Sequence, residues 1–168
     1  MPWTPLDSVV LDWNLESWLD DYASRVSFPI VVTSGIRTPR KQAKAMFTKI
    51  ELGDDLLKIY KDDTFAQKII DAYPNLDKAE RIVSEYAKAG GGSSHLRGMG
   101  VDIRTRDLTE AQKKELVQAV KDMGDSPLLE STPPHLHITL KKKRVQETNL
   151  RSLAIILVLI GGAVWTLK

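Results

Sequence analysis

Apolar residues recur along this chain with two different periods, one typical of helices and one typical of strands. The segment 6–26 has apolar side chains at helical intervals, and we expect an amphipathic helix that packs on the core through Leu11, Leu15, Trp18, Leu19 and Tyr22. Thr38-Pro39 is typical of an N-cap followed by proline at the first helical position, which predicts a helix over 38–52.

Two further stretches have helical patterns. Residues 54–88 predict two or three short helices broken around Pro74. Residues 109–123 predict a helix that has a capping box at Thr109 and Gln112 and ends at Gly124.

Short β-branched or alternating runs predict strands over 29–33, 100–104, 128–130 and 135–141. We expect an α+β fold with a small antiparallel sheet and flanking helices.

The end of the chain has a different composition. Residues 153–167 read LAIILVLIGGAVWTL, without a charge, between Arg151 and Lys168. As a helix this run is about 22 Å long, and flanking cations that snorkel to the headgroups help such a run to span a bilayer. We expect a transmembrane anchor over 151–168, a linker over 145–150 and one domain over 1–144. Burial of the run in the domain or in an oligomer interface is the alternative.

Composition narrows the possible partners and the possible metal ligands. The 24 basic and 22 acidic residues leave a net charge of +2, so we do not expect nucleic acid as a partner. The chain has no cysteine, which excludes a disulfide framework, a cysteine nucleophile and thiolate zinc ligands. Any metal must therefore be bound by histidine and carboxylate.

The three histidines lie in two short segments beside predicted strands, and each segment also holds a carboxylate. His95 follows a glycine-rich loop, and Asp102 lies seven residues later in a strand. His135 and His137 share one face of another strand, and Glu130 precedes them across a turn. Two imidazoles and a carboxylate suit zinc with one position left for water, and a further glutamate can serve hydrolysis as a base.

Three motifs resemble those of a known family. They are SGIR at 34–37, SSHLRGMGVD at 93–102 and ESTPPHLH at 130–137. They are similar to motifs of the D-alanyl-D-alanine carboxypeptidase and endolysin family, whose fold is shared with lysostaphin-type enzymes and the hedgehog domain. The resemblance implies a zinc metallopeptidase that hydrolyses peptidoglycan stem peptides, either as a D,D-carboxypeptidase or as an endopeptidase at an L-Ala-D-Glu or D,D bond.

The resemblance also implies a role for each motif residue. The implied Zn²⁺ ligands are His95, Asp102 and His137, and the implied general base is Glu130. The implied substrate-binding residues are Arg37, Ser93 and Gln42. Arg37 is expected to hold a carboxylate or carbonyl of the substrate, and His135 to stabilise the tetrahedral intermediate.

Two positions depart from the family pattern. Glu130 lies seven residues before His137, farther than is usual, which leaves open whether His135 or His137 binds the metal. Use of the second histidine in such pairs within the family favours His137. Gly100 stands where alanine is commoner, and because both residues are small we expect the close packing beside the site to be kept.

Ordinary structural roles are alternatives for these residues. Arg37 is alternatively a surface arginine at a strand-to-helix turn, Ser93 a loop residue, and Glu130 a strand-end carboxylate paired with a nearby lysine. For the protein as a whole, the alternatives are a non-catalytic, zinc-stabilised and membrane-anchored binding module, and a tail-anchored adaptor without a metal.

The cellular setting follows from the two ends of the chain. Residues 1–11 lack the cationic and then apolar pattern of a signal peptide, and the basic run 141–144 beside the anchor favours a cytoplasmic orientation. Peptidoglycan lies outside that membrane. A bacteriophage lysis or entry enzyme, seated in a virion membrane or in the host cell envelope, would reconcile these features.

Overall fold

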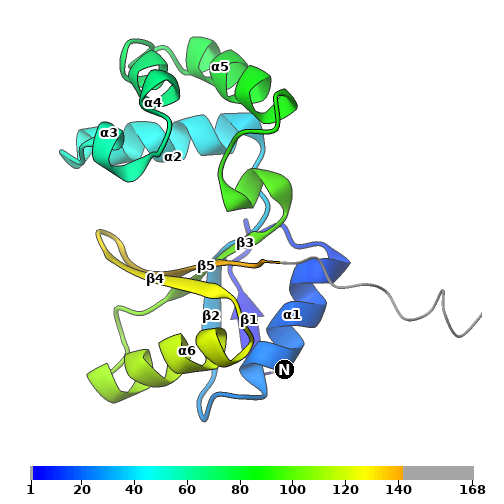
Figure 1. The fold of residues 1–168 in the computed structure, drawn as a ribbon. Helices are drawn as coiled ribbons and strands as arrows, with labels where there is room; N and C mark the ends of the chain where they lie inside the picture. The colour runs from blue at the N-terminus through cyan, green and yellow to red at the C-terminus, as the bar shows by residue number, and fades with distance from the viewer. Residues whose placement is uncertain (1, 142–168) are drawn as a thin grey trace, which may run out of the picture.

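A five-stranded sheet lies between two groups of helices in the computed structural model, which describes residues 2–141 (Figure 1). The strands are β1 (Trp3–Pro5), β2 (Ile30–Ser34), β3 (Gly100–Arg104), β4 (Ser126–Ser131) and β5 (Pro134–Thr139). Their order in the sheet is β1-β2-β3-β5-β4.

The sheet is mixed, so the predicted antiparallel sheet is wrong. β1 pairs with β2 in parallel, whereas β2 with β3, β3 with β5 and β4 with β5 are antiparallel pairs. The parallel pair arises because helix α1 (Trp13–Ala23) connects the two strands, and a crossover returns the chain in the same direction. The sequence did not predict β1, which is three residues long and lies between prolines.

Helix α1 is shorter than the predicted helix over 6–26. It begins at Trp13 because Asp12 is its N-cap, and the Asp12 Oδ1 atom accepts a hydrogen bond from the Leu15 N–H at 3.0 Å. Leu11 therefore lies before the helix. Trp18, Leu19 and Tyr22 are buried as the periodicity predicts.

The main core lies between the sheet and two helices, α1 and α6 (Glu110–Asp122), on one face (Figure 1). Val101 and Ile103 of β3 and Leu136 and Ile138 of β5 are fully buried in this core. Because side chains alternate along a strand, Asp102 and His137 point to the opposite face. The capping box predicted at Thr109 and Gln112 is present at the start of α6.

A lobe of four helices occupies the chain between β2 and β3. These are α2 (Pro39–Glu51), α3 (Leu56–Ile59), α4 (Asp63–Ile70) and α5 (Leu76–Lys88), which confirms the helix predicted after Thr38 and the short helices that follow it. The lobe has a core of its own, centred on Met46, Phe47, Phe65, Ile69 and Val83. It lies across the sheet from α6 (Figure 1).

The chain returns from this lobe to β3 through a short 3₁₀ helix, η1 (Ser94–Arg97). This turn was expected to be a loop. β4 and β5 then form a hairpin with Glu130 directly opposite His135. β4 is longer than the strand predicted over 128–130, and β5 ends two residues before the strand predicted over 135–141.

The sequence also predicted a C-terminal transmembrane helix as part of the fold, and the structure does not bear out that part of the prediction. The predicted anchor over 151–168 lies outside the described residues. Within residues 2–141, no helix has the length and apolarity needed to cross a membrane.

Candidate metal centre

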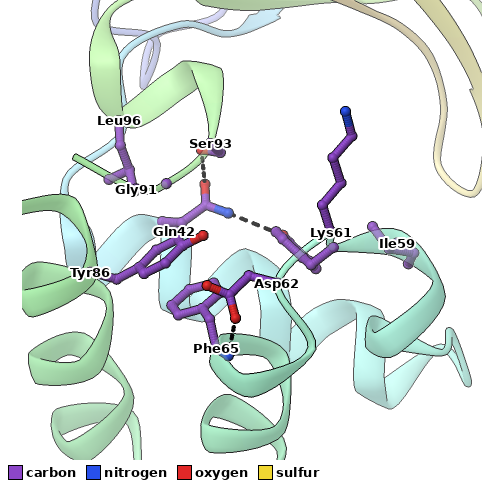
Figure 2. A pocket seen from close by; sticks show the side chains of 11 residues that line it. Gln42, Ile59, Lys61, Asp62, Phe65, Tyr86, Gly91, Ser93 and Leu96 are labelled. Atoms are coloured by element: carbon purple, nitrogen blue, oxygen red, sulfur yellow. Dashed lines mark hydrogen bonds between the residues drawn. The ribbon is translucent and has the colours of Figure 1, made fainter. Parts of the chain in front are cut away.

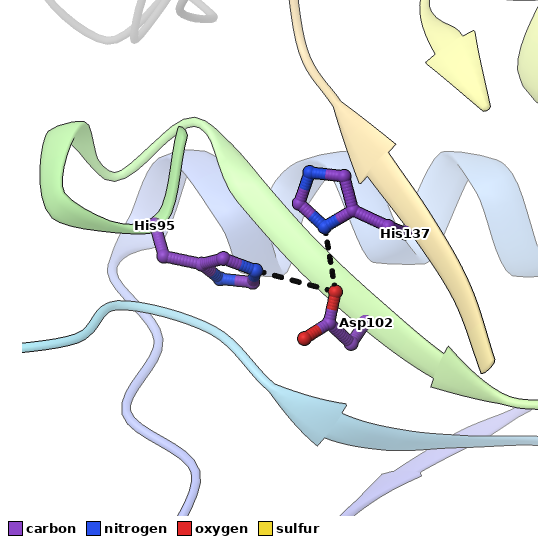
Figure 3. A group of neighbouring side chains, drawn as sticks. All are labelled: His95, Asp102 and His137. Carbon is purple, nitrogen blue, oxygen red and sulfur yellow. Dashed lines mark hydrogen bonds and ion pairs between the residues drawn. The ribbon is translucent and has the colours of Figure 1, made fainter. Parts of the chain in front are cut away.

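Three side chains converge on the sheet face that carries Asp102 (Figure 3). His95 comes from η1, Asp102 from β3 and His137 from β5, where it pairs directly with Asp102 in the strand register. The Asp102 Oδ1 atom lies 3.2 Å from His95 Nε2 and 2.7 Å from His137 Nδ1. One ligand atom from each residue lies within 4.8 Å of the others, so this group could hold a metal ion.

The backbone fixes the tautomer of His95. Its Nδ1 atom lies 2.7 Å from the Gly35 carbonyl oxygen, and because a carbonyl can only accept, Nδ1 carries the proton. Burial lowers the pKa of His95 against the opposing effect of Asp102, so the ring is neutral. The Nε2 lone pair then faces a carboxylate oxygen of Asp102. A proton or a metal cation between the two atoms stabilises this contact.

His137 has partners that suit a ligand. Its Nε2 atom lies 3.1 Å from Ser94 Oγ and 3.2 Å from Thr139 Oγ1. When a hydroxyl accepts from Nε2, the Nδ1 lone pair is directed at the same oxygen of Asp102, and when a hydroxyl donates to Nε2, Nδ1 donates to that oxygen. Such hydrogen bonds to the second ring nitrogen are the usual support of a metal-binding histidine.

His135 lies beside the group rather than within it. Its Nδ1 atom lies 2.6 Å from the Pro133 carbonyl oxygen, so Nδ1 carries a proton. Nε2 lies 3.8 Å from Asp102 Oδ1 and 3.7 Å from Glu130 Oε1. His135 therefore directs Nε2 at the two carboxylates of the site.

Arg37 contacts the group through Asp102. Its Nη2 atom donates to Asp102 Oδ2 at 2.6 Å, its Nε to Ser34 Oγ at 2.9 Å and its Nη1 to Gln42 Oε1 at 3.3 Å. Burial raises the pKa of Asp102, but its contacts with His137 and His95 and the charge of Arg37 outweigh burial and hold that pKa well below the usual range. Asp102 is thus an anion throughout the physiological range.

Gln42 and Ser93 form one polar connection beside the centre. Gln42 is buried, its Oε1 accepts from both Arg37 and Ser93 Oγ, and its Nε2 donates to the Tyr60 hydroxyl oxygen at 3.2 Å. Burial raises the pKa of Tyr60 to about 12, so its hydroxyl keeps a proton that it can donate. Arg37 and Ser93 both contact Gln42, so the structure brings together these three residues, which the family resemblance gives as substrate-binding.

Glu130 lies on the same face and is half-buried. Its Oε2 atom pairs with Lys49 Nζ of α2 at 2.8 Å, so the hairpin and the helical lobe are joined across the site. The sequence alternative of a lysine partner for Glu130 therefore also has a counterpart in the structure. Lys49 was missed because it lies far from Glu130 in the chain and in no motif.

Several other contributors were missed by the sequence interpretation. Ser34 and Ser94 stand inside the motifs SGIR and SSHLRGMGVD, yet their contacts with Arg37 and His137 depend on loop geometry. The Gly35 carbonyl, which contacts His95, is a backbone group, and Tyr60, which contacts Gln42, lies outside the three motifs, so residue type did not indicate either contact. The close packing expected beside Gly100 is present, but it depends on glycine: an added Cβ would lie 2.5 Å from Ser94 Oγ and 2.7 Å from the His95 backbone nitrogen, so alanine does not fit without a shift.

Comparisons with protein-family models, with curated proteins and with solved structures found no match to this chain.

Proposed function

We propose that this protein is a zinc-dependent hydrolase of peptidoglycan stem peptides, of the D-alanyl-D-alanine carboxypeptidase and endolysin type. The observation that carries the proposal is the convergence of His95, Asp102 and His137 on the sheet face that also holds Glu130. The three motifs that resemble that family supply the same residues.

The donor set favours zinc over other biological cations. Two imidazole nitrogens and one carboxylate suit zinc, whereas magnesium and calcium prefer oxygen ligands. Bonds of about 2.0 to 2.1 Å around a tetrahedral ion separate its ligands by about 3.4 Å. The distance of 3.2 Å between His95 Nε2 and Asp102 Oδ1 is close to that value, whereas the 2.7 Å between His137 Nδ1 and the same oxygen is shorter. Three protein ligands also leave one position for substrate chemistry.

A bound zinc ion would supply Lewis acidity that polarises the scissile carbonyl and makes water more acidic. Glu130 accepts the proton of the attacking water through Oε1, the oxygen that is not paired with Lys49 at 2.8 Å, and delivers it to the leaving nitrogen. The hydroxyl adds to the carbonyl carbon and the C–N bond breaks. One water is consumed, and no other reactant is needed.

The polar residues around the centre position the peptide. Arg37 donates three of its five N–H groups to Ser34, Gln42 and Asp102, so two can donate to a substrate carboxylate or carbonyl. His135 directs Nε2 toward Asp102 and Glu130, and we assign it the stabilisation of the tetrahedral intermediate that the family resemblance implies.

Glu130→Gln tests the proposal. Glutamine keeps the shape of the side chain but cannot accept the proton, and positioned general bases contribute about 10²- to 10⁴-fold. We expect kcat on purified stem peptides to fall at least about 100-fold while bound zinc stays at the wild-type level. Glu85→Gln, an exposed site on α5, is the matched control and should retain wild-type kcat.

One observation favours a second candidate, a non-catalytic zinc-stabilised module. The ion pair between Glu130 and Lys49 gives the carboxylate a structural role without any catalysis. In that case the wild-type protein binds zinc but releases no product from sacculi or stem peptides. Product release by the wild type together with its loss in Glu130→Gln would exclude the module.

A further inference from the structure

One helix of the lobe contacts the surroundings of the candidate metal centre at two points. Helix α2 carries Gln42 near its start and Lys49 near its end, and because seven residues make almost two full turns, both side chains lie on one helix face. Gln42 accepts a hydrogen bond from Ser93 Oγ (Figure 2) and another from Arg37. Lys49 pairs with Glu130 of β4. The helix is therefore a rigid connection between Arg37 and Glu130.

The contact between Lys49 and Glu130 is largely shielded from solvent. The two side chains are 21% and 24% exposed, and the Lys49 Nζ atom lies 2.8 Å from Glu130 Oε2. A carboxylate oxygen of Asp54, which follows α2, lies 3.7 Å from the same ammonium group. Water and salt screen a covered ion pair less than a surface pair, so this contact restrains the two side chains more strongly than a surface ion pair does.

Glu130 depends on this contact because its strand gives the side chain little support. β4 is an edge strand that pairs with β5 on one side, and most of its residues are exposed. A glutamate side chain has three rotatable bonds, so the backbone of β4 does not determine where the carboxylate lies. Within residues 2–141, Lys49 provides the hydrogen bond that this carboxylate accepts.

The ion pair distinguishes the two oxygens of the Glu130 carboxylate. Oε2 accepts from Lys49, whereas Oε1 lies 3.7 Å from His135 Nε2. The same nitrogen lies 3.8 Å from Asp102 Oδ1. Lys49 thus holds one oxygen toward the lobe and leaves the other directed at the metal group.

We propose that Lys49 is a positioning residue for the general base: it fixes Glu130 so that Oε1 faces the metal group, and through it the helical lobe determines the orientation of the base. This inference rests on the proposed function and adds a residue that contacts no member of the metal group. Positioning affects the rate strongly, because a displacement of about 1 Å can lower a rate by about 100-fold.

Lys49→Met tests the positioning role, because methionine is also long and unbranched but has neither a charge nor a hydrogen-bond donor. We expect kcat on purified stem peptides to fall about ten- to 100-fold, with KM and bound zinc at the wild-type level, because the lost contact acts on the base in the transition state. Lys49→Arg keeps a cation beside Glu130 and should recover most of this activity. Lys44→Met changes an exposed lysine on the same helix and, as the matched control, should retain wild-type kcat.

The double variant separates positioning from a general effect on the fold. If Lys49 acts through Glu130, Lys49→Met should cause no further loss of the residual kcat in the Glu130→Gln background. An equal loss in both backgrounds, or wild-type kcat in Lys49→Met, would overturn the positioning role while leaving the hydrolase intact. A rise in kcat would also overturn it, since the ion pair would then restrain the base. A wild-type protein that cleaves no stem peptide would instead contradict the proposed function.

Discussion

At the scale of single residues, backbone carbonyls determine what the imidazole rings can do. The Gly35 carbonyl holds the proton of His95 on Nδ1, and the Pro133 carbonyl does the same for His135. His95, whose pKa burial lowers, therefore presents an Nε2 lone pair toward Asp102. A neutral ring ready to bind a cation needs no deprotonation step, which favours metal binding near neutral pH.

The two strand histidines should differ in their effect on zinc. His137→Ala removes a member of the converging group, and we expect zinc affinity to fall more than about 100-fold, beyond the usual cost of losing an outer partner. His135→Ala should weaken zinc binding by no more than about tenfold. Competition with a chromogenic chelator measures both. Wild-type affinity in His137→Ala with a large loss in His135→Ala would reverse the assignment.

Some residues of the candidate metal centre and its surroundings could be predicted from the sequence, and others could not. His95 and Asp102 are close in the chain, and the His-x-His spacing places two rings on one strand face, so local geometry was enough. Lys49 meets Glu130 through the packing of a whole lobe on a hairpin, which no local pattern records. The positions of the ring protons depend on the carbonyls of Gly35 and Pro133. Because every residue has a backbone carbonyl, the sequence does not show which carbonyls will contact a histidine.

At the scale of elements, the close approach of η1 to the start of β3 sets the position of His95. Gly100 has no side chain, and the Ser94 hydroxyl and the His95 backbone fill the space where a Cβ would stand. Gly98 ends η1 with a φ of 65°, a left-handed conformation that favours glycine. Two glycines thus let a histidine fold back over its own strand.

Gly100→Ala tests this packing. The added methyl group forces Ser94 and His95 to move, and overpacking of this kind costs about 1 to 3 kcal/mol of unfolding free energy. We expect both thermal stability and zinc affinity to fall. Gly53→Ala is the contrast, because its φ is 82° but its added Cβ meets no atom, so it should lower stability and leave zinc affinity unchanged.

Tyr22 joins α1 to α6 and makes their packing sensitive to alkaline pH. Its hydroxyl donates to the Leu116 carbonyl oxygen at 3.1 Å, and burial, with a smaller effect of Glu115, raises its pKa far above 10. In the unfolded chain the phenol ionises near pH 10. Its folded pKa is higher, so its stabilisation is complete below about pH 10 and is lost as the pH rises further.

Tyr22→Phe should remove this dependence. At pH 8 the variant loses one hydrogen bond and is expected to be less stable by about 1 kcal/mol. At pH 11 the wild type also loses about 1.4 kcal/mol through Tyr22, so the difference between the two proteins should disappear. Urea unfolding at both pH values measures it. A constant difference would show that Tyr22 ionises equally in both states.

At the scale of elements and sheet, the sequence predicted interior helices well and terminal elements poorly. The helices after Thr38 and Thr109 carry strong caps, and their starts match the structure. The helix over 6–26 was predicted too long because the apolar residues before Asp12 share its period by chance. β1 is short and contributes Trp3 to the core, but its pairing with β2 depends on tertiary contact.

At the scale of the whole molecule, the candidate metal centre connects parts of the chain that are distant in sequence. His95 and Asp102 belong to the region that follows the helical lobe, and His137 belongs to the final hairpin. The unfolded chain does not hold these three residues together. A metal that binds them therefore stabilises the folded state by linkage.

Removal of zinc should accordingly lower the unfolding temperature. Zinc at 100 times its dissociation constant adds about 2.7 kcal/mol, and a chelator abolishes this contribution. Scanning calorimetry with and without the chelator measures the shift. His137→Ala should show little shift, because its affinity for zinc is already lost. An equal shift in the variant would place the stabilising ion elsewhere.

The topology of the sheet has a further consequence for how such a protein can diversify. β2 and β3 are adjacent antiparallel strands, so the chain leaves the sheet for the helical lobe and returns to it at neighbouring positions. Residues 39–93 therefore behave as a cassette: they can be lengthened, shortened or exchanged without changing the order of any strand or the positions of Asp102 and His137. Because Gln42 and Lys49 belong to this cassette, a graft from another protein would change the partners of Arg37 and Glu130 while leaving His95, Asp102 and His137 in place.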